Sequence, residues 1–189
     1  MQRFALAEVQ AAAALLKRGG VLAYPTEAVF GLGCDPRNAA AFTRLFELKR
    51  RPASEGVLLI AADFAQVEPF IDHTAVSRRV LDDVRATWPG PHTWIFPRSA
   101  SVPPWVTGSH AGIALRVTDH PPAVALCRAF GGALVSTSAN PHGHPPARDV
   151  ASVERWFGDA LDGVLDAAVG ELAQPTTIRD AISGAIIRA

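Results

Sequence analysis

The feature that most constrains the fold is a series of short apolar runs. Residues 21–24, 57–61 and 133–136 have the length of buried strands and are far too short to span a membrane as helices. Segments between such runs repeat their apolar residues with the period of a helix. Because strands and helices interleave without strict alternation, we predict an α/β protein with a twisted, mixed parallel/antiparallel sheet flanked by helices. The expected helices cover residues 6–18, 39–51, 74–87, 121–130 and 150–157, and further strands cover 93–96, 112–117, 163–167, 176–179 and 185–188.

Length and composition describe one globular domain. A chain of 189 residues fits the usual ~100–200 residues per domain, and no linker divides it, so we expect a single domain over residues 1–189. No run approaches ~18 apolar residues, so no membrane association is expected. The N-terminus lacks a signal-peptide layout, and Cys34 and Cys127 lie far apart without a CxxC motif, which indicates a reducing, cytoplasmic location.

The charge is balanced overall but uneven along the chain. A formal net charge of zero argues against a protein that coats nucleic acid. Residues 1–51 hold eight basic residues against four acidic ones, whereas residues 149–180 hold seven acidic residues against two basic ones. A local positive site on a neutral protein suits a small anionic ligand better than a long polyanion.

The common nucleotide-binding and hydrolase motifs are missing. No Gly-Lys-[Ser/Thr] string exists for a Walker A loop, and Gly31-Leu32-Gly33 lacks the third glycine of a dinucleotide fingerprint. There is no GxSxG nucleophile motif. His142 and His144 lie in a loop rich in Pro and Gly, where capping or solvent-facing roles outweigh metal binding, so no protein metal site is predicted.

One basic segment, Lys49-Arg50-Arg51-Pro52, follows the second expected helix. It can be a basic C-cap that offsets the helix dipole, an effect worth a few tenths to about 1 kcal/mol. It can also be an anion site, because a planar arginine beside a lysine is the pair that holds phosphate and carboxylate oxygens. The polar turn at residues 53–56 lets at least two of the cations project from irregular backbone.

Two further segments leave the ends of expected buried strands. Residues 24–33 offer side-chain oxygens at Thr26 and Glu27 and allow close backbone approach at Gly31 and Gly33, but they also fit an ordinary strand-to-helix connection. Residues 136–140, with the sequence STSAN, are rich in hydroxyl and amide groups, and ligands collect at such strand ends in α/β sheets. A Ser/Asn-capped turn is the alternative.

Together these segments resemble the motif set of YrdC-like proteins. The shared strings are Tyr24-Pro-Thr-Glu, Gly31-Leu-Gly, Lys49-x-Arg51 and Ser138-x-Asn140, and Ala114-Leu-Arg116-Val-Thr-Asp-His-Pro121 is similar to the short bacterial threonylcarbamoyl-AMP synthases of the family. The resemblance runs from about Leu15 to the C-terminus. It implies a YrdC-like sheet around a concave, positively charged site. It also implies condensation of L-threonine, bicarbonate or carbon dioxide, and ATP into threonylcarbamoyl-AMP and pyrophosphate.

The resemblance implies a role for nine residues by position. Two are expected to be catalytic and to hold the ATP phosphates and the bicarbonate or carbamate: Lys49 and Arg51. Four are expected to bind threonine: Thr26, Arg116, Ser136 and Thr176. Three more are expected to line the nucleotide site: Ser138, Asn140 and Arg188. Thr176 stands where the family commonly has serine, and the pattern leaves open whether Thr176 or Thr177 makes the contact. Arg50 is expected to lie outside the site.

The resemblance also implies partners. ATP is expected to bring Mg²⁺, held mostly by phosphate oxygens and water. The product is expected to pass to a separate tRNA threonylcarbamoyl transferase complex, and direct binding of tRNA or other RNA is left open. The alternative is a double-stranded RNA- or tRNA-binding or ribosome-maturation module without catalysis, which the zero net charge and the single tyrosine disfavour. A third interpretation is a paralogue that binds nucleotide without activity, against which the retained Lys49-x-Arg51 and Ser138-x-Asn140 argue.

Overall fold

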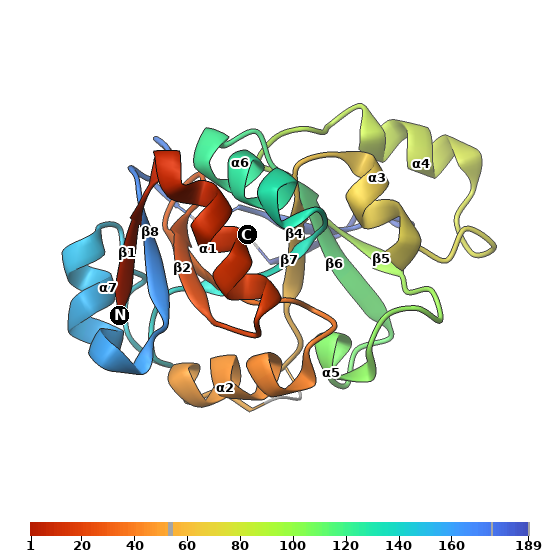
Figure 1. The fold of residues 1–189 in the computed structure, drawn as a ribbon. Coiled ribbons are helices and arrows are strands. Elements are labelled where there is room, and N and C mark those ends of the chain that lie inside the picture. The colour runs from red at the N-terminus through yellow and green to blue at the C-terminus, as the bar shows by residue number, and fades with distance from the viewer. Residues whose placement is uncertain (53–54, 175, 189) are drawn as a thin grey trace.

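A mixed sheet of ten strands runs through the described part of the chain, residues 1–52, 55–174 and 176–188 of a computed structural model (Figure 1). From one edge to the other, the strands are β1 (Gln2–Ala5), β8 (Gly163–Asp166), β2 (Leu22–Pro25), β3 (Phe30–Gly33), β7 (Leu134–Ser138), β4 (Leu58–Ala61), β6 (Gly112–Val117), β5 (Thr93–Pro97), β9 (Ile178–Asp180) and β10 (Ile186–Arg188). Pairs β4–β6 and β5–β9 are parallel, whereas β3–β7 and β4–β7 are antiparallel. The predicted mixed sheet is therefore confirmed.

Helices flank this sheet (Figure 1). The α-helices are α1 (Val9–Lys17), α2 (Ala39–Lys49), α3 (Phe64–Val67), α4 (Arg78–Arg85), α5 (Pro104–Thr107), α6 (Pro121–Phe130) and α7 (Val150–Phe157), joined by the 3₁₀ turns η1 (Leu6–Glu8), η3 (Glu68–Phe70) and η4 (Gly158–Ala160). α1 packs against α6, and the pair covers β8, β2 and β4. None of the helices within the described ranges combines the length and apolarity needed to cross a membrane.

Alternate residues of the central strands enter two different cores. On β2, Leu22 and Tyr24 join the core beneath α1 and α6, while Ala23 enters the core that contains Phe42 and Leu45 of α2. The centre of the sheet is therefore buried on both faces. This explains why its strands appear in the sequence as short apolar runs instead of alternating patterns.

Polar caps determine where several helices begin. Asn38 Oδ1 accepts a hydrogen bond from the Ala41 amide at 3.0 Å, and Asp149 Oδ1 accepts one from the Ser152 amide at 2.7 Å. The helix expected over residues 74–87 is shorter, because α4 begins only after its N-cap, Ser77. The helix expected over residues 6–18 opens as the 3₁₀ turn η1 before α1.

The sequence does not predict two of the strands. β1 pairs with β8, which lies at the opposite end of the sequence. β3 lies in the segment that also fits a strand-to-helix connection, and it pairs with both β2 and β7. A Cβ atom at Gly33 would lie 2.6 Å from the Val135 carbonyl oxygen and 2.6 Å from the Tyr24 ring. The close backbone approach predicted at Gly33 is therefore confirmed.

We expect Gly33→Ala to destabilise the protein by about 1–3 kcal/mol, because the added methyl group has no room between β2 and β7. Gly132→Ala is the matched control, since its Cβ would meet nothing closer than the Phe130 ring at 3.8 Å. That change should be neutral or should stabilise by about 0.4–1 kcal/mol. Urea unfolding of both variants measures the difference, and equal effects would contradict the packing described at Gly33.

Candidate active site

A cavity of about 700 Å³ lies over one face of the sheet. Its walls include residues of seven neighbouring strands, in sheet order β3, β7, β4, β6, β5, β9 and β10. The sequence of β6 shows how this space arises. Gly112, Ala114 and Arg116 face the cavity, while Ile113 and Leu115 between them enter the core. The cavity side of the strand thus carries two very small residues followed by one long cation, which leaves a hollow with a guanidinium at one end.

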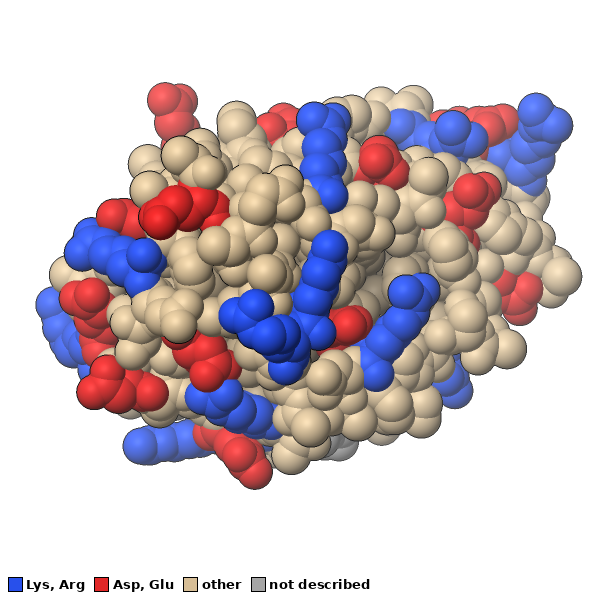
Figure 2. Space-filling view, in the orientation of Figure 1, with Lys and Arg blue, Asp and Glu red and all other residues tan. Residues whose placement is uncertain are grey.

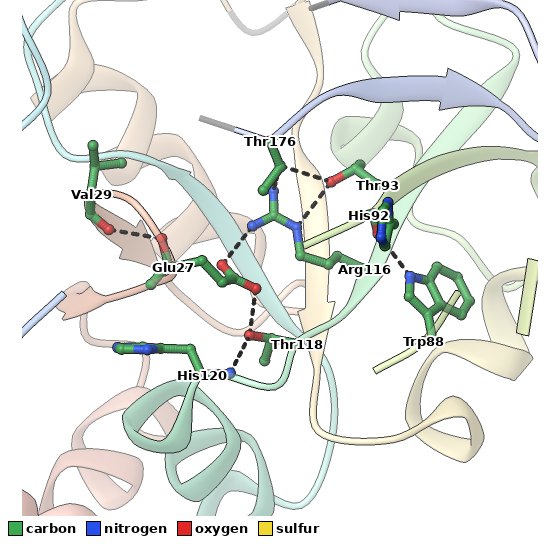
Figure 3. A network of polar contacts seen from close by, with 10 residues as sticks. Glu27, Val29, Trp88, His92, Thr93, Arg116, Thr118, His120 and Thr176 are labelled. Carbon is green, nitrogen blue, oxygen red and sulfur yellow. Dashed lines mark hydrogen bonds and ion pairs between the residues drawn. The ribbon is translucent and has the colours of Figure 1, made fainter. Parts of the chain in front are cut away.

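Arg116 lines the cavity and is held by three neighbours (Figure 3). Its Nε donates to Thr93 Oγ1 at 2.9 Å, its Nη1 donates to Glu27 Oε2 at 2.9 Å, and its Nη2 donates to the Thr176 hydroxyl. Arg116 is only 6% exposed and Glu27 only 5%. A guanidinium has five N–H bonds, so these contacts leave two for a ligand, which is the number that a bidentate carboxylate takes.

Both oxygens of the Glu27 carboxylate are occupied (Figure 3). Oε2 accepts from Arg116, and Oε1 accepts from Thr118 Oγ1 at 2.7 Å. Sequence reasoning noted Glu27 only as a source of oxygens and gave it no role, although it directly follows Thr26 in the Tyr-Pro-Thr-Glu string. It gave no role to Thr93, or to Thr118 within the Ala114–Pro121 string, because a lone threonine at the end of a strand carries no signal of its own.

The four hydroxyl residues assigned to ligand binding lie together in the cavity wall: Thr26, Ser136, Ser138 and Thr176. Thr26 Oγ1 donates to the Val29 carbonyl oxygen at 2.7 Å, which closes the turn between β2 and β3. Thr176 lines the cavity and its neighbour Thr177 does not, so the structure places the first of the two threonines at the site.

The connection between β8 and β9, residues 167–177, brings Thr176 to the cavity from across the sheet. Six strands separate β8 from β9. The Gly170 amide donates to the Thr26 carbonyl oxygen at 2.9 Å, and the Leu172 amide donates to that of Glu27 at 3.1 Å. A Cβ atom at Gly170 would lie 2.5 Å from the Glu27 carbonyl oxygen, so glycine is required for this close contact.

Arg51 lines the cavity, whereas Arg50 takes a left-handed backbone conformation (φ 51°) and does not line it, as expected. Arg51 Nη1 donates to Thr137 Oγ1 at 3.4 Å and Nη2 to the Gly56 carbonyl oxygen at 3.2 Å. Its Nε pairs with the Glu55 carboxylate. Residues 53 and 54 of the expected polar turn lie outside the described residues, as does Pro175 of the string that precedes Thr176.

Lys49 lies behind the cavity wall. Its ammonium donates to the Ser138 carbonyl oxygen, to the Asn140 carbonyl oxygen at 3.0 Å and to Asn140 Oδ1 at 3.2 Å, so all three of its N–H bonds hold this turn. Burial, reinforced by the charge of Arg51, lowers the pKa of Lys49 from 10.5 to about 8. Neither Lys49 nor Asn140 lines the cavity, and their contact with ATP stays a prediction.

Arg188 reaches the cavity from β10. Burial, followed by the charges of Arg116 and Arg51, lowers the pKa of its guanidinium. Glu27 pairs with Arg116 and Glu55 pairs with Arg51, but no carboxylate within the described ranges pairs with Arg188. The cavity therefore holds three arginines, of which two are matched by a carboxylate.

The cavity wall offers few ligands to a metal ion. Glu55 is the carboxylate among its described residues, and Arg51 already pairs with it. Over the residues that the structure describes, no three His, Cys, Asp or Glu side chains gather as metal ligands. This donor set fits Mg²⁺ that arrives on phosphate oxygens and keeps water ligands.

Removing the Glu27 carboxylate leaves the buried Arg116 charge without its partner. We expect Glu27→Ala to lower the free energy of unfolding by about 3–5 kcal/mol. Glu55→Ala is the control, because the Glu55 side chain is 42% exposed and exposed ion pairs contribute about 0–1 kcal/mol. Denaturant unfolding measures both, and a Glu27 effect no larger than that of Glu55 would be inconsistent with a buried ion pair.

The lowered pKa of Lys49 makes stability depend on pH. Between pH 8 and pH 10.5 the unfolded chain binds more protons at Lys49 than the folded protein does. The free energy of unfolding therefore gains a contribution from Lys49 that rises with pH over this window. Lys49→Met removes that contribution. Urea unfolding from pH 7.5 to pH 10 should show a flatter profile for the variant, and parallel profiles would rule out the shifted pKa.

Comparison with known proteins agrees with the geometry. The Sua5/YciO/YrdC family model, described as telomere recombination, matches residues 14–189. A threonylcarbamoyl-AMP synthase of Xanthomonas campestris pv. campestris is 54% identical over 181 residues, which cover 96% of this chain and 97% of that protein. A threonylcarbamoyl-AMP synthase of Cellvibrio japonicus is 51% identical over 185 residues, covering 95% and 94% of the two chains.

Solved structures share the fold. P. abyssi Sua5 complexed with L-threonine matches with a TM-score of 0.87 and 27% identity over 95% of this chain. The match covers 53% of the Sua5 chain, so this protein spans about half the length of that relative. E. coli YciO matches with a TM-score of 0.82 and 24% identity, covering 99% of this chain and 94% of YciO. The family model, the relatives and the shared fold together establish that this chain belongs to the Sua5/YciO/YrdC family.

Proposed function

We propose that the protein is an L-threonylcarbamoyladenylate synthase, which condenses L-threonine, bicarbonate or carbon dioxide, and ATP into threonylcarbamoyl-AMP and pyrophosphate. The observation that carries the proposal is the setting of Arg116, a buried guanidinium with two N–H bonds left over and hydroxyl groups around it. Such a fork fits the carboxylate of an amino acid. The names of the X. campestris and C. japonicus relatives, and the threonine complex of P. abyssi Sua5, support the same substrate.

The threonine subsite follows from this setting. Arg116 takes the substrate carboxylate, and the hydroxyls of Thr26, Ser136 and Thr176 offer donors and acceptors to the amine and side chain of threonine. The amine then points into the cavity, where it forms a C–N bond to the carbon of carbon dioxide or bicarbonate and loses a proton, which gives the carbamate. Bicarbonate releases water in this step.

The second step transfers the adenylate group. A carbamate oxygen attacks the α-phosphorus of ATP, the bond to the bridging oxygen breaks, and pyrophosphate leaves. In this proposal Arg51 and Arg188, which line the cavity, meet the phosphates, and Lys49 supports the Ser138–Asn140 turn. No side-chain nucleophile is required, because positioning and charge stabilisation supply the catalysis. Mg²⁺ on the triphosphate would neutralise part of the charge that develops there.

The wider role is part of the same proposal. Threonylcarbamoyl-AMP is a reactive mixed anhydride, so a separate tRNA threonylcarbamoyl transferase complex would use it to modify tRNA, in the cytoplasm. Direct binding of tRNA receives less support from the surface. Figure 2 shows Lys and Arg interspersed with Asp and Glu over the face in view, without a broad area of one sign. RNA-binding proteins without catalysis depend on many phosphate contacts, which such a surface supplies poorly.

The test is release of pyrophosphate from ATP that depends on L-threonine and bicarbonate. We expect Arg51→Ala to lower kcat/KM by about 10²–10³, because it removes a cation that meets the phosphates. Arg50→Gly is the matched control: it removes the neighbouring cation, lies outside the cavity, and glycine adopts a φ of 51° without strain. Its activity should stay near that of the wild type.

Two results would overturn the proposal. Wild-type protein that releases no pyrophosphate above a threonine-free control is not this synthase. Tight, salt-dependent binding of RNA without detectable binding of ATP would instead favour the RNA-binding alternative.

A further inference from the structure

We propose that Glu27 makes the Arg116 subsite selective for the carboxylate of the amino acid over phosphate groups. The inference rests on the proposed function, because it concerns how two anionic substrates divide one cavity of about 700 Å³ between them. Three arginines line that cavity, and each of them can in principle bind either anion. The arrangement of carboxylates behind them differs from one arginine to the next.

Glu27 acts through Arg116 and does not contact the ligand. It is not one of the residues that line the cavity, and it is only 5% exposed. Arg116 Nη1 occupies its Oε2 at 2.9 Å, and the Thr118 hydroxyl occupies its Oε1 at 2.7 Å. Figure 3 shows the carboxylate between the Arg116 guanidinium and the Thr118 hydroxyl, with its orientation set from two sides. Glu27 is therefore a positioning residue.

The first effect of Glu27 is geometric. With Glu27, Thr93 and Thr176 holding one N–H bond each, the guanidinium cannot rotate, and its two remaining N–H bonds keep a fixed direction. A planar carboxylate satisfies such a pair with its two oxygens. A phosphate group can also meet two N–H bonds, so geometry alone does not separate the two anions.

The second effect of Glu27 is electrostatic. A ligand bound to Arg116 experiences the attraction of the guanidinium and, slightly farther away, the repulsion of the Glu27 carboxylate. Both the attraction and the repulsion grow in proportion to the charge of the ligand, so Glu27 removes more binding free energy from a highly charged ligand than from a monoanion. A monoanionic carboxylate therefore loses part of its attraction, while a polyphosphate with several negative charges loses several times as much. Because the pair is buried, water screens this difference only weakly.

At Arg51 and Arg188, a neighbouring carboxylate offsets less of the guanidinium's attraction for an anion. Glu55 pairs with Arg51 near the open side, where its side chain is 42% exposed and solvent weakens its field. Arg188 has no carboxylate partner in the described part of the chain. The phosphates are therefore drawn toward Arg188 and Arg51, and the pocket at Arg116 stays free for the amino acid.

Calorimetric titration of L-threonine with and without inorganic tripolyphosphate tests the inference. In the wild type, tripolyphosphate should leave the Kd of threonine unchanged within about two-fold. Glu27→Gln keeps the shape of the side chain, and its amide can still accept from Arg116 and donate to Thr118. In this variant, tripolyphosphate should compete for the Arg116 subsite and raise the apparent Kd of threonine by about ten-fold or more, because the carboxylate that repels tripolyphosphate is gone; ten-fold corresponds to about 1.4 kcal/mol.

Glu55→Gln is the matched control, because it removes the carboxylate behind a different arginine. It should strengthen the binding of tripolyphosphate without making tripolyphosphate displace threonine. If Glu27→Gln does not fold, as judged by circular dichroism, Thr118→Val provides the second variant. It keeps the Glu27 charge and removes one of its anchors, so it should weaken threonine binding several-fold while threonine remains insensitive to tripolyphosphate.

The outcomes separate the inference from the function on which it rests. If the wild type binds no L-threonine, the proposed function fails and the inference fails with it. If the wild type binds threonine but tripolyphosphate displaces it as readily as from Glu27→Gln, the synthase proposal stands and the role of Glu27 is overturned. Displacement from Glu55→Gln to the same extent as from Glu27→Gln would also overturn it, because the selectivity would then not arise from Glu27.

Discussion

The ion pair between Glu27 and Arg116 is the interaction on which the site depends. It joins the turn after β2 to the cavity face of β6, two parts of the sheet that are far apart in the sequence. Glu27 also fixes the connection between β8 and β9, because its carbonyl oxygen accepts the Leu172 amide at 3.1 Å and its backbone lies against Gly170. One residue thus holds the guanidinium with its side chain and the β8–β9 connection with its backbone.

The basic side chains in and behind the cavity wall use their N–H bonds in two different ways. Three arginines line the open space: Arg51, Arg116 and Arg188. Lys49 instead donates all three of its N–H bonds to the Ser138–Asn140 turn. This division suits the two kinds of side chain. A rigid guanidinium can bind a wall and a ligand at the same time, while a compact ammonium is readily enclosed by carbonyl oxygens.

Local signals in the sequence predicted much of the fold. The helices over residues 121–130 and 150–157 and the apolar runs of β2 and β4 are decided by neighbouring residues, and the structure confirms them. The sequence did not predict β1 or β3. β1 is a strand only through its pairing with β8. β3 contains two glycines, which disfavour a strand unless it has partners on both sides. At the site, seven of the nine residues to which the resemblance gives a role line the cavity. The motifs could not show that the Lys49 ammonium holds the Ser138–Asn140 turn, because the carbonyl groups that it contacts lie about 90 residues later in the chain.

The order of strands in the sheet has a consequence for how the protein forms during synthesis. β1 at the start of the chain pairs with β8, and Thr176 and Arg188 complete the cavity from the last described segments. Contacts between such distant parts of a chain make folding slow, because long loops must close before the contacts form. A nascent chain that has not yet released residues 163–188 from the ribosome therefore has an unpaired edge at β1 and an unfinished pocket. Until β8 emerges, the edges of β1 and β2 that pair with it stay unpaired, and the nascent chain depends on the speed of elongation and on chaperones to avoid aggregation.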